Sequence, residues 1–172
     1  MSDFRKQYGP WAIVTGASAG IGKSIATELA SRGLNVVLVA RRQSLLDDLQ
    51  VELSEDYGVE IRTIRADLTS PEIISMIELL TSDLEVGLVV PNAGAEINGK
   101  FIDSTLEDND HLLRLNAHAP MQLAKVFGAR MAQRGNGGIL FISSLVAYQG
   151  TPYLAQYAAT KAYILSLGEA LH

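Results

Sequence analysis

Short apolar segments alternate along the chain with longer segments in which apolar residues recur every three or four positions. An apolar run of about four to eight residues is typical of a buried strand, and the wider spacing is typical of a helix that covers a core. The pattern predicts strands at residues 12–15, 35–40, 59–66, 86–90 and 138–143. It predicts helices at residues 20–32, 44–57, 71–81, 106–134 and from 153 onward.

This alternation of strands and helices is typical of a parallel sheet, because parallel neighbours need a crossover connection that a tight hairpin cannot supply. Strands that are apolar on both faces agree with this interpretation, since crossover helices cover both sides of such a sheet. We therefore expect one doubly wound α/β domain of the Rossmann type over residues 1–172, with strand order 3-2-1-4-5 and helices on both faces.

The C-terminal part of the sequence lacks the features that usually close such a domain. The last helical pattern stays apolar on one side up to His172, with no glycine, asparagine or proline stop after it. A fifth strand at the edge of a parallel sheet would also leave pairing groups exposed. The expectation is therefore that the domain is incomplete at its C-terminus.

Composition narrows the possible functions. The formal net charge is -5 and the Lys and Arg residues are scattered, which argues against a nucleic-acid or anionic-membrane partner. The absence of cysteine excludes disulfides, thiolate metal sites and cysteine nucleophiles. The first residues lack the apolar core of a signal peptide, and no apolar run reaches the length of a membrane span. A soluble, cytoplasmic protein is expected.

The segment after the first predicted strand, TGASAGIGKS, is rich in glycine. Its end, Gly22-Lys23-Ser24, matches the P-loop motif that holds nucleoside triphosphates, but that motif needs a glycine where Ala17 stands. A strand-to-helix turn presents backbone N–H groups and the positive helix end to a phosphate. Gly16 would permit the turn, Gly20 would let a pyrophosphate approach, and Gly22 would let helix and strand pack closely. The spacing favours a dinucleotide, with a glycine-rich turn that binds nothing as the alternative.

The end of the second predicted strand indicates which dinucleotide is expected. Folds that bind NAD usually carry an acidic residue there for the ribose 2′-hydroxyl, whereas an arginine accommodates the 2′-phosphate of NADP. Ala40 occupies this position and is followed by Arg41 and Arg42. Because a guanidinium binds phosphate well, we expect Arg41 to contact NADP. For Arg42, a solvated position is an equal alternative.

A second set of candidate residues lies in the segment ISSLVAYQGTPYLAQYAATK at 142–161. Tyr157 and Lys161 are four residues apart, so on a helix they share one face. A nearby ammonium favours the ionised form of a phenol, as a group that transfers protons near neutral pH requires. The pair alone is equally compatible with a solvated helix surface, because such spacings also arise by chance.

Taken in order, the motifs resemble those of the short-chain dehydrogenase/reductase family from about Pro10 to the last residue. They are TGxxxGIG at 15–22, NAG at 92–94, Asn116, Ser144 and the Tyr157–Lys161 pair. The resemblance implies an oxidoreductase that transfers a hydride between NADP(H) and a small-molecule carbonyl or alcohol substrate. It also implies that the family continues beyond this length through two more strands.

The resemblance implies a role for each catalytic residue. Tyr157 would be the general acid or base at the substrate oxygen, and Ser144 would hydrogen-bond that oxygen, with Ser143 structural. Lys161 would bind the nicotinamide ribose and favour the ionised phenol. Asn116 would support a proton relay through its backbone carbonyl. Pro120 has no N–H to donate to that carbonyl four residues earlier, although a packing kink would explain a proline there equally well.

Further positions follow the family's cofactor cleft and its assembly. The resemblance implies cofactor contacts at Gly16, Ser18, Gly20, Ile21, Gly22, Arg41, Asp67, Leu68, Asn92, Ala93, Gly94, Tyr157 and Lys161. A homodimer or homotetramer is expected, because relatives commonly pair through the helices that match 106–134 and 153–172. His111 and His118 could share a helix face, but no third ligand accompanies them, so no metal is expected.

Two other functions stay compatible with the sequence. A chain without the segment that closes over substrate could be a non-catalytic NADP-binding or interaction module. A P-loop nucleotide hydrolase would need an acidic residue at the end of an apolar strand to hold magnesium. Asp67 is the only fair candidate, and Arg62 and Arg65 interrupt the run before it.

Overall fold

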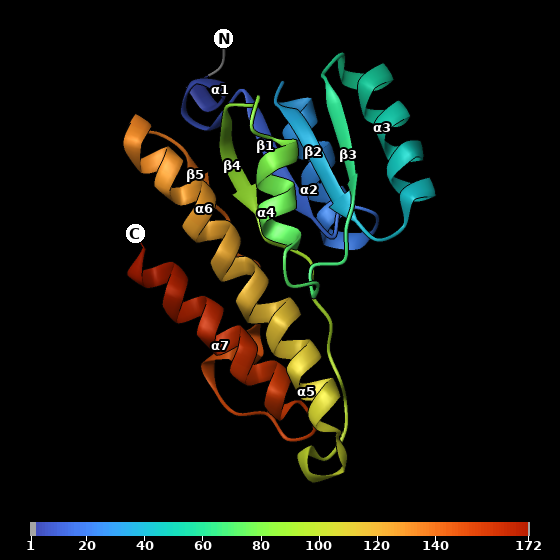
Figure 1. Cartoon of the computed structure of the whole chain (residues 1–172), viewed down its shortest axis with the longest axis vertical. Helices are drawn as coiled ribbons and strands as arrows, with labels where there is room; N and C mark the ends of the chain where they lie inside the picture. Colours follow the sequence, from blue (N-terminus) through green and yellow to red (C-terminus); the bar gives the residue numbers. More distant parts are fainter. Residues whose placement is uncertain (1–2, 172) are drawn as a thin grey trace.

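The computed structural model describes residues 3–171 and contains a five-stranded sheet in which all neighbouring strands are parallel. The strands are β1 (Trp11–Thr15), β2 (Asn35–Ala40), β3 (Ile61–Arg65), β4 (Val86–Val90) and β5 (Gly138–Ile139). Their order across the sheet is β3-β2-β1-β4-β5, which confirms the predicted doubly wound topology (Figure 1).

Helices connect the strands and continue beyond the sheet. The α-helices are α1 (Asp3–Tyr8), α2 (Gly20–Ser31), α3 (Gln43–Tyr57), α4 (Ile73–Leu80), α5 (Leu106–Leu113), α6 (Ala119–Arg134) and α7 (Ala155–Ala170). A π-helical turn, η2 (Arg114–His118), joins α5 to α6, and η1 (Phe101–Asp103) and η3 (Leu145–Tyr148) are short 3-10 turns. The pattern did not predict α1, because six residues give too little periodicity to recognise a helix. Between residues 3 and 171, no helix is both long and apolar enough to cross a bilayer.

The hydrophobic core lies on both faces of the sheet. On β2, Val36 and Leu38 point to one face and Val37 and Val39 to the other, and all four are fully buried. Helices α2 and α3 cover the first face, and α4 and α6 cover the second. Figure 1 shows α4 in front of the sheet and α2 behind it. The predicted three-layer arrangement is therefore confirmed.

The fifth strand is shorter than the apolar pattern predicts. Pairing to β4 covers only β5 and ends with a 2.9 Å hydrogen bond from Leu140 N to Val89 O. Pro91 follows β4 and has no N–H, and the next donor, Asn92 N, bonds to Thr15 Oγ1 instead. The prediction of a strand over 138–143 was therefore wrong for residues 140–143, because β4 offers no further donor there.

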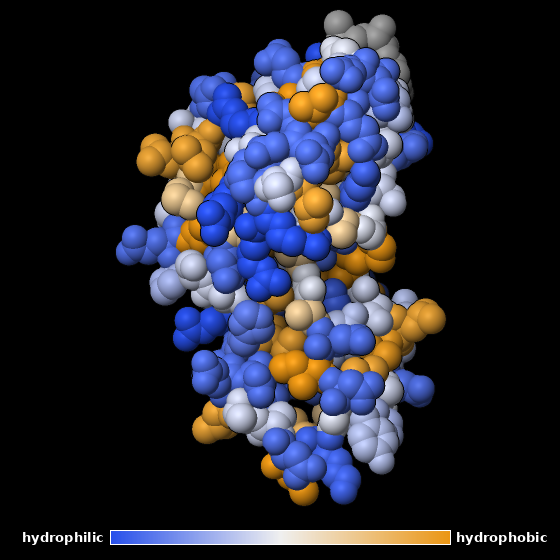
Figure 2. Space-filling view, turned by 90° about the vertical axis from the view of Figure 1, so that its right-hand side faces the viewer, coloured by the Kyte–Doolittle hydropathy of each residue, from blue (hydrophilic) through white to orange (hydrophobic). Residues whose placement is uncertain are grey.

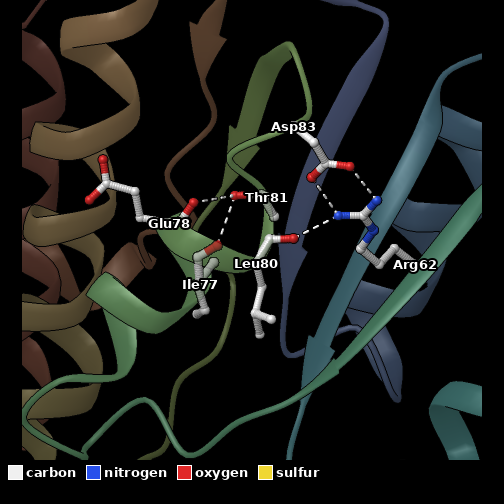
Figure 3. Close-up of polar contacts among 6 residues, drawn as sticks. All are labelled: Arg62, Ile77, Glu78, Leu80, Thr81 and Asp83. Atoms are coloured by element: carbon white, nitrogen blue, oxygen red, sulfur yellow. Dashed lines mark hydrogen bonds and ion pairs between the residues drawn. The ribbon is translucent and has the colours of Figure 1, made fainter.

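Side-chain bonds fix the start of β4 relative to β3. Arg62 on β3 forms a bidentate ion pair with Asp83, at 2.9 Å for both bonds, and also donates to Leu80 O at 2.6 Å (Figure 3). The hydroxyl of buried Thr81 donates to Ile77 O at 2.8 Å, which ties the residue after α4 to that helix. The turn before β4 is thus held from two sides.

Candidate active site

The glycine loop lies between β1 and α2, and each of its glycines meets a different constraint. Gly16 and Gly20 have φ of 66° and 55°, in the left-handed region that favours glycine. A Cβ at Gly16 would lie 2.8 Å from Asn92 Nδ2, and one at Gly22 would collide with Gly16 O and Asn92 Nδ2. A Cβ at Gly20 would meet nothing within 4 Å. Two glycines therefore admit the segment after β4, and the third faces open space.

The P-loop alternative fits this geometry poorly. The ammonium of Lys23 pairs with Glu52 on α3 at 2.8 Å, and the hydroxyl of Ser24 donates to Gly20 O within α2. A P-loop lysine reaches the phosphates, and its serine holds magnesium. Both side chains are instead engaged as ordinary residues of a helix surface.

A cluster of three hydrogen bonds, which we name the strand clamp, joins the end of β1 to the segment after β4. Thr15 Oγ1 accepts from the backbone N–H groups of Asn92 and Ala93 at 3.0 and 3.1 Å. Asn92 Nδ2 donates to Thr15 O at 2.9 Å. Thr15 is 1% exposed, so these bonds lie away from water. The strand clamp places the Asn92–Gly94 segment directly over the glycine loop.

A cavity of about 220 Å³ opens at the carboxyl ends of the strands, beside this clamp. Seven of the predicted cofactor residues line it: Gly16, Ser18, Arg41, Asp67, Leu68, Ala93 and Gly94. The other six predicted residues are not in its lining: Gly20, Ile21, Gly22, Asn92, Tyr157 and Lys161. Ile21 is 62% exposed in the first turn of α2. The switch point of the strand order is where ligands bind in open α/β sheets.

Charged side chains surround the cavity. Arg41 and Arg42 both lie in the cavity wall. Arg42 also donates to Ser18 Oγ at 3.0 Å. Asp67 accepts from the backbone N–H of Thr69 at 3.0 Å and from its hydroxyl at 2.8 Å, and these bonds lower the pKa of Asp67. The charges of Arg41 and His111 lower the pKa of Asp67 further. The wall therefore favours an anionic group near the arginines.

His111 is a lining residue that sequence reasoning did not select. It lies on α5 and lines the cavity. The sequence offered only its spacing from His118, which indicates a shared helix face and nothing about the sheet. Its proximity to Asp67 depends on how the fold places α5 relative to the segment after β3, and no local pattern encodes that.

Lys161 is buried on α7 and tied to the segment after β5. Its Nζ donates to Ile142 O at 2.8 Å and lies 5.7 Å from the ring centroid of Tyr157. Burial lowers the pKa of Lys161. Ser143, which the sequence marked as structural, donates its hydroxyl to Lys161 O at 2.9 Å. Lys161 is therefore held beside the phenol ring by two bonds, one from its ammonium to Ile142 O and one to its backbone carbonyl from Ser143.

A second cluster, which we name the helix clamp, joins the segment after β4 to two helices. Asn116, 1% exposed in η2, accepts from Ala95 N at 3.0 Å and donates to Ala95 O at 2.7 Å. Its Nδ2 also donates to Thr160 Oγ1 at 3.2 Å, and the Thr160 hydroxyl donates to Tyr157 O at 2.7 Å. The sequence predicted Asn116 for its carbonyl and missed this use of its side chain.

Gly94 connects the cavity to these polar groups. A Cβ at Gly94 would lie 3.2 Å from Asn116 Oδ1 and 3.6 Å from Lys161 Nζ. The cavity lining and the α7 residues are therefore neighbours. Ser144 immediately precedes η3 and caps it, because its Oγ accepts from Val146 N at 3.4 Å. Among residues 3–171, no hydrogen bond links Ser144 directly to Tyr157.

Comparison with known proteins gives relatives over nearly the whole chain. It is 39% identical over 168 residues to a very-long-chain 3-oxoacyl-CoA reductase of Bos taurus, covering 95% of this chain and 54% of the relative. A bulky-bulky ketone specific alcohol dehydrogenase from Comamonas testosteroni superposes with a TM-score of 0.90 and 39% identity, and the match covers 95% of this chain and 66% of that protein. A short-chain dehydrogenase from Sphingobium yanoikuyae in complex with NADPH superposes with a TM-score of 0.90 and is 37% identical, and the match covers 95% of this chain and 64% of that protein.

These relatives are longer proteins, and the chain spans from about half to two thirds of their length. The family model described as short chain dehydrogenase matches residues 10–172. That match contains the glycine loop, both clamps and the Tyr157–Lys161 pair. The chain therefore belongs to the short-chain dehydrogenase family.

Proposed function

We propose that the chain carries the cofactor site and the catalytic residues of an NADP(H)-dependent oxidoreductase acting on a carbonyl or alcohol. The observation that carries the proposal is the position of Lys161. It is a buried ammonium beside the Tyr157 ring, and it adjoins the cavity wall at Gly94. The neighbour from Sphingobium yanoikuyae is a complex with NADPH, which supports the choice of cofactor.

The residues around the cavity fit a dinucleotide phosphate. The open space at Gly20 leaves the first turn of α2 free for a pyrophosphate, whose charge the helix N-terminus favours. Ser18, Ile21 and the other glycines would form the rest of this contact. Arg41 and Arg42 are the cations expected to hold a 2′-phosphate. When bound, the nicotinamide would supply or accept the hydride.

The residues beyond Gly94 would manage the proton. Tyr157 would transfer it to or from the substrate oxygen, and the ammonium of Lys161 would stabilise the phenolate. Ser144, at the start of η3, would hydrogen-bond the same oxygen. Asn116 would contribute through its backbone carbonyl, to which Pro120 cannot donate. The side chain of Asn116 is already occupied in the helix clamp, so it would act on the segment after β4 and not on substrate.

The proposed substrate is a bulky, largely apolar ketone or alcohol. Directly after Ser144, Leu145 and Tyr148 are 86% and 75% exposed, and a cavity of about 280 Å³ is lined in part by Phe101 and Tyr153. Figure 2 shows apolar side chains among polar ones on the lower half of the molecule, at the level where Figure 1 places α5 and the start of α7. The relatives named for very-long-chain 3-oxoacyl-CoA and for bulky-bulky ketones support this substrate class.

The proposed enzyme is a cytoplasmic homo-oligomer. Helices α6 and α7 lie side by side (Figure 1), and Leu113 and Tyr163 are each 45% exposed on α5 and α7. A second copy of the chain would cover such residues, because apolar surface is favourable to bury. Sedimentation velocity would test this, and a monomer at all concentrations would contradict it.

The decisive experiment pairs cofactor titration with one substitution. NADPH should bind more tightly than NADH, and Arg41→Glu should reduce that preference. Tyr157→Phe should lower turnover of a bulky ketone by roughly 10²–10⁴-fold while leaving the Kd for NADPH within about twofold. Unchanged turnover in Tyr157→Phe would contradict the assignment. NADPH binding with no turnover in the unmodified chain would instead support a non-catalytic binding module.

A further inference from the structure

Thr160 is a buried polar residue to which the proposed mechanism gives no role. It is 1% exposed and lies next to Lys161 on α7. A threonine inside a helix commonly donates its hydroxyl to a carbonyl three or four residues earlier, and Thr160 does so to Tyr157 O at 2.7 Å. Its oxygen also accepts from Asn116 Nδ2 at 3.2 Å, across from a different helix. The hydroxyl is therefore used as both donor and acceptor.

The hydroxyl of Thr160 is the third hydrogen-bond partner of the Asn116 carboxamide. An asparagine side chain has two N–H donors and one oxygen acceptor. One donor reaches Ala95 O, the second reaches Thr160, and the oxygen accepts from Ala95 N. A flipped amide would present donors to the Ala95 N–H and an oxygen to the Ala95 carbonyl. Among the described residues, Thr160 is the one hydrogen-bond partner of this amide on α7.

The same atoms lie close to the ammonium. The Cβ position of Gly94 is 3.2 Å from Asn116 Oδ1 and 3.6 Å from Lys161 Nζ. A shift of the Gly94–Ala95 segment by a fraction of these distances would change the surroundings of Nζ. The Thr160 hydroxyl connects the two sides, because it also holds the carbonyl of Tyr157.

We infer that Thr160 is a positioning residue of the site. Its hydroxyl ties the Asn116 carboxamide to α7 and thereby fixes the Gly94–Ala95 segment relative to Tyr157 and Lys161. The effect on catalysis rests on the proposed function, whereas the effect on the position of Ala95 does not.

The test compares three variants. Thr160→Val keeps the shape without the hydroxyl, and Thr160→Ser restores a hydroxyl. Thr81→Val is the matched control, because Thr81 is also buried and its hydroxyl bonds carbonyls of its own helix, Ile77 O at 2.8 Å and Glu78 O at 3.4 Å (Figure 3). The control removes a buried threonine hydroxyl without touching the helix clamp.

The first measurement is amide hydrogen exchange by nuclear magnetic resonance on the chain without cofactor. The Ala95 N–H donates to Asn116 Oδ1, so its exchange reports the orientation of the carboxamide. In Thr160→Val, Ala95 should exchange about tenfold faster relative to the amides of β1, as expected for loss of one buried hydrogen bond. Thr160→Ser should return it to within about threefold of the unmodified chain. Thr81→Val should move Ala95 no more than it moves β1.

The second measurement is the pH profile of turnover at saturating NADPH. Thr160→Val should lower kcat about tenfold and displace the profile, and Thr160→Ser should restore both. Exchange of Ala95 that only follows β1 in Thr160→Val would overturn the proposal, and so would failure of the serine variant to rescue. If Thr160→Val does not fold, rapid exchange of the Asn116 carboxamide protons in the unmodified chain would overturn it. A chain without turnover would defeat the proposed function and leave the exchange result decisive here.

Discussion

The strand clamp and the helix clamp hold the same short segment, Asn92 to Ala95, from opposite sides. The strand clamp acts between neighbouring strands, where the pairs Ile13↔Val89 and Val14↔Val90 already fix β1 to β4. The helix clamp has no backbone ladder beside it, because the Asn116 side chain bonds the backbone of Ala95 and the hydroxyl of Thr160. One clamp reinforces an existing contact, and the other makes a contact that would not otherwise exist.

This difference separates stability from positioning. Loss of a bond that a ladder supports should cost free energy of unfolding but leave the segment near its place. Loss of the bonds that Asn116 makes to Ala95 and to Thr160 should let the segment move relative to Lys161. The position of Ala95 relative to α7 therefore depends more on the side chains of Asn116 and Thr160 than on the sheet.

The largest effect is expected for Asn116→Leu. This change removes three hydrogen bonds and leaves the N–H and C=O of Ala95 without partners, so the free energy of unfolding should fall by about 3 kcal/mol. Urea denaturation measures it. Asn109→Leu, which loses bonds of the exposed α5 start, is the control and should cost about 1 kcal/mol. Equal losses in the two variants would argue against a distinct helix clamp.

The next largest loss of stability is expected for Gly22→Ala, because the added methyl group would clash with the strand clamp. The added Cβ would collide with Gly16 O and Asn92 Nδ2, so backbone must shift, at about 2 kcal/mol. Gly20→Ala has open space and a left-handed φ, and should cost about 1 kcal/mol. Denaturation measures both. A Gly20 variant less stable than the Gly22 variant would contradict the close approach of the two segments.

A smaller effect is expected for Thr15→Val, which leaves the shape of the strand clamp intact. It removes the acceptor for the N–H groups of Asn92 and Ala93, and the free energy of unfolding should fall by about 1.5 kcal/mol. Thr15→Ser should recover most of this. If Thr15→Val displaced the Ala95 amide as strongly as Asn116→Leu, the ladder would not support the segment as described.

The smallest effect concerns the pH dependence that burial of Lys161 creates. Its pKa is lowered in the folded chain, so the folded state disfavours the ammonium. Between that lowered pKa and the unfolded value near 10.4, the unfolded chain binds more protons, and stability rises with pH. Lys161→Met should lack this component of the rise, as thermal unfolding between neutral and alkaline pH would show. A parallel pH dependence in both proteins would contradict the desolvation of Lys161.

Periodicity predicted the layers because it reports burial, and burial is what the sheet imposes on β2 and β4. Their predicted bounds, 35–40 and 86–90, agree with the structure. Periodicity failed at 140–143, where the chain is largely apolar but finds no backbone donor on the neighbouring strand. Pro91 has no N–H, and the N–H of Asn92 donates to Thr15 Oγ1 instead. Pairing depends on a partner that the local pattern does not contain.

The site divides in the same way. The glycine loop and the Tyr157–Lys161 pair are local patterns, so the sequence could locate them. Thr160 and His111 belong to no local pattern, because their importance comes from contacts with residues far away in the sequence, Asn116 for Thr160 and Asp67 for His111. The fold supplies those contacts by packing α5 and α7 against each other and against η2, and no spacing within either helix records it.

The π-helical turn η2 makes the continuous helix from α5 to α6 sensitive to the insertion or deletion of single residues. Its bond from Ala119 N to Arg114 O encloses one residue more than an α-helical turn, and each residue advances a helix by roughly 100°. Deleting one residue between Arg114 and His118 would let a regular helix form, but Asn116 and the core residue Phe127 could no longer both face their present neighbours. Natural variation here should therefore take the form of exchanged side chains, while insertions and deletions are excluded.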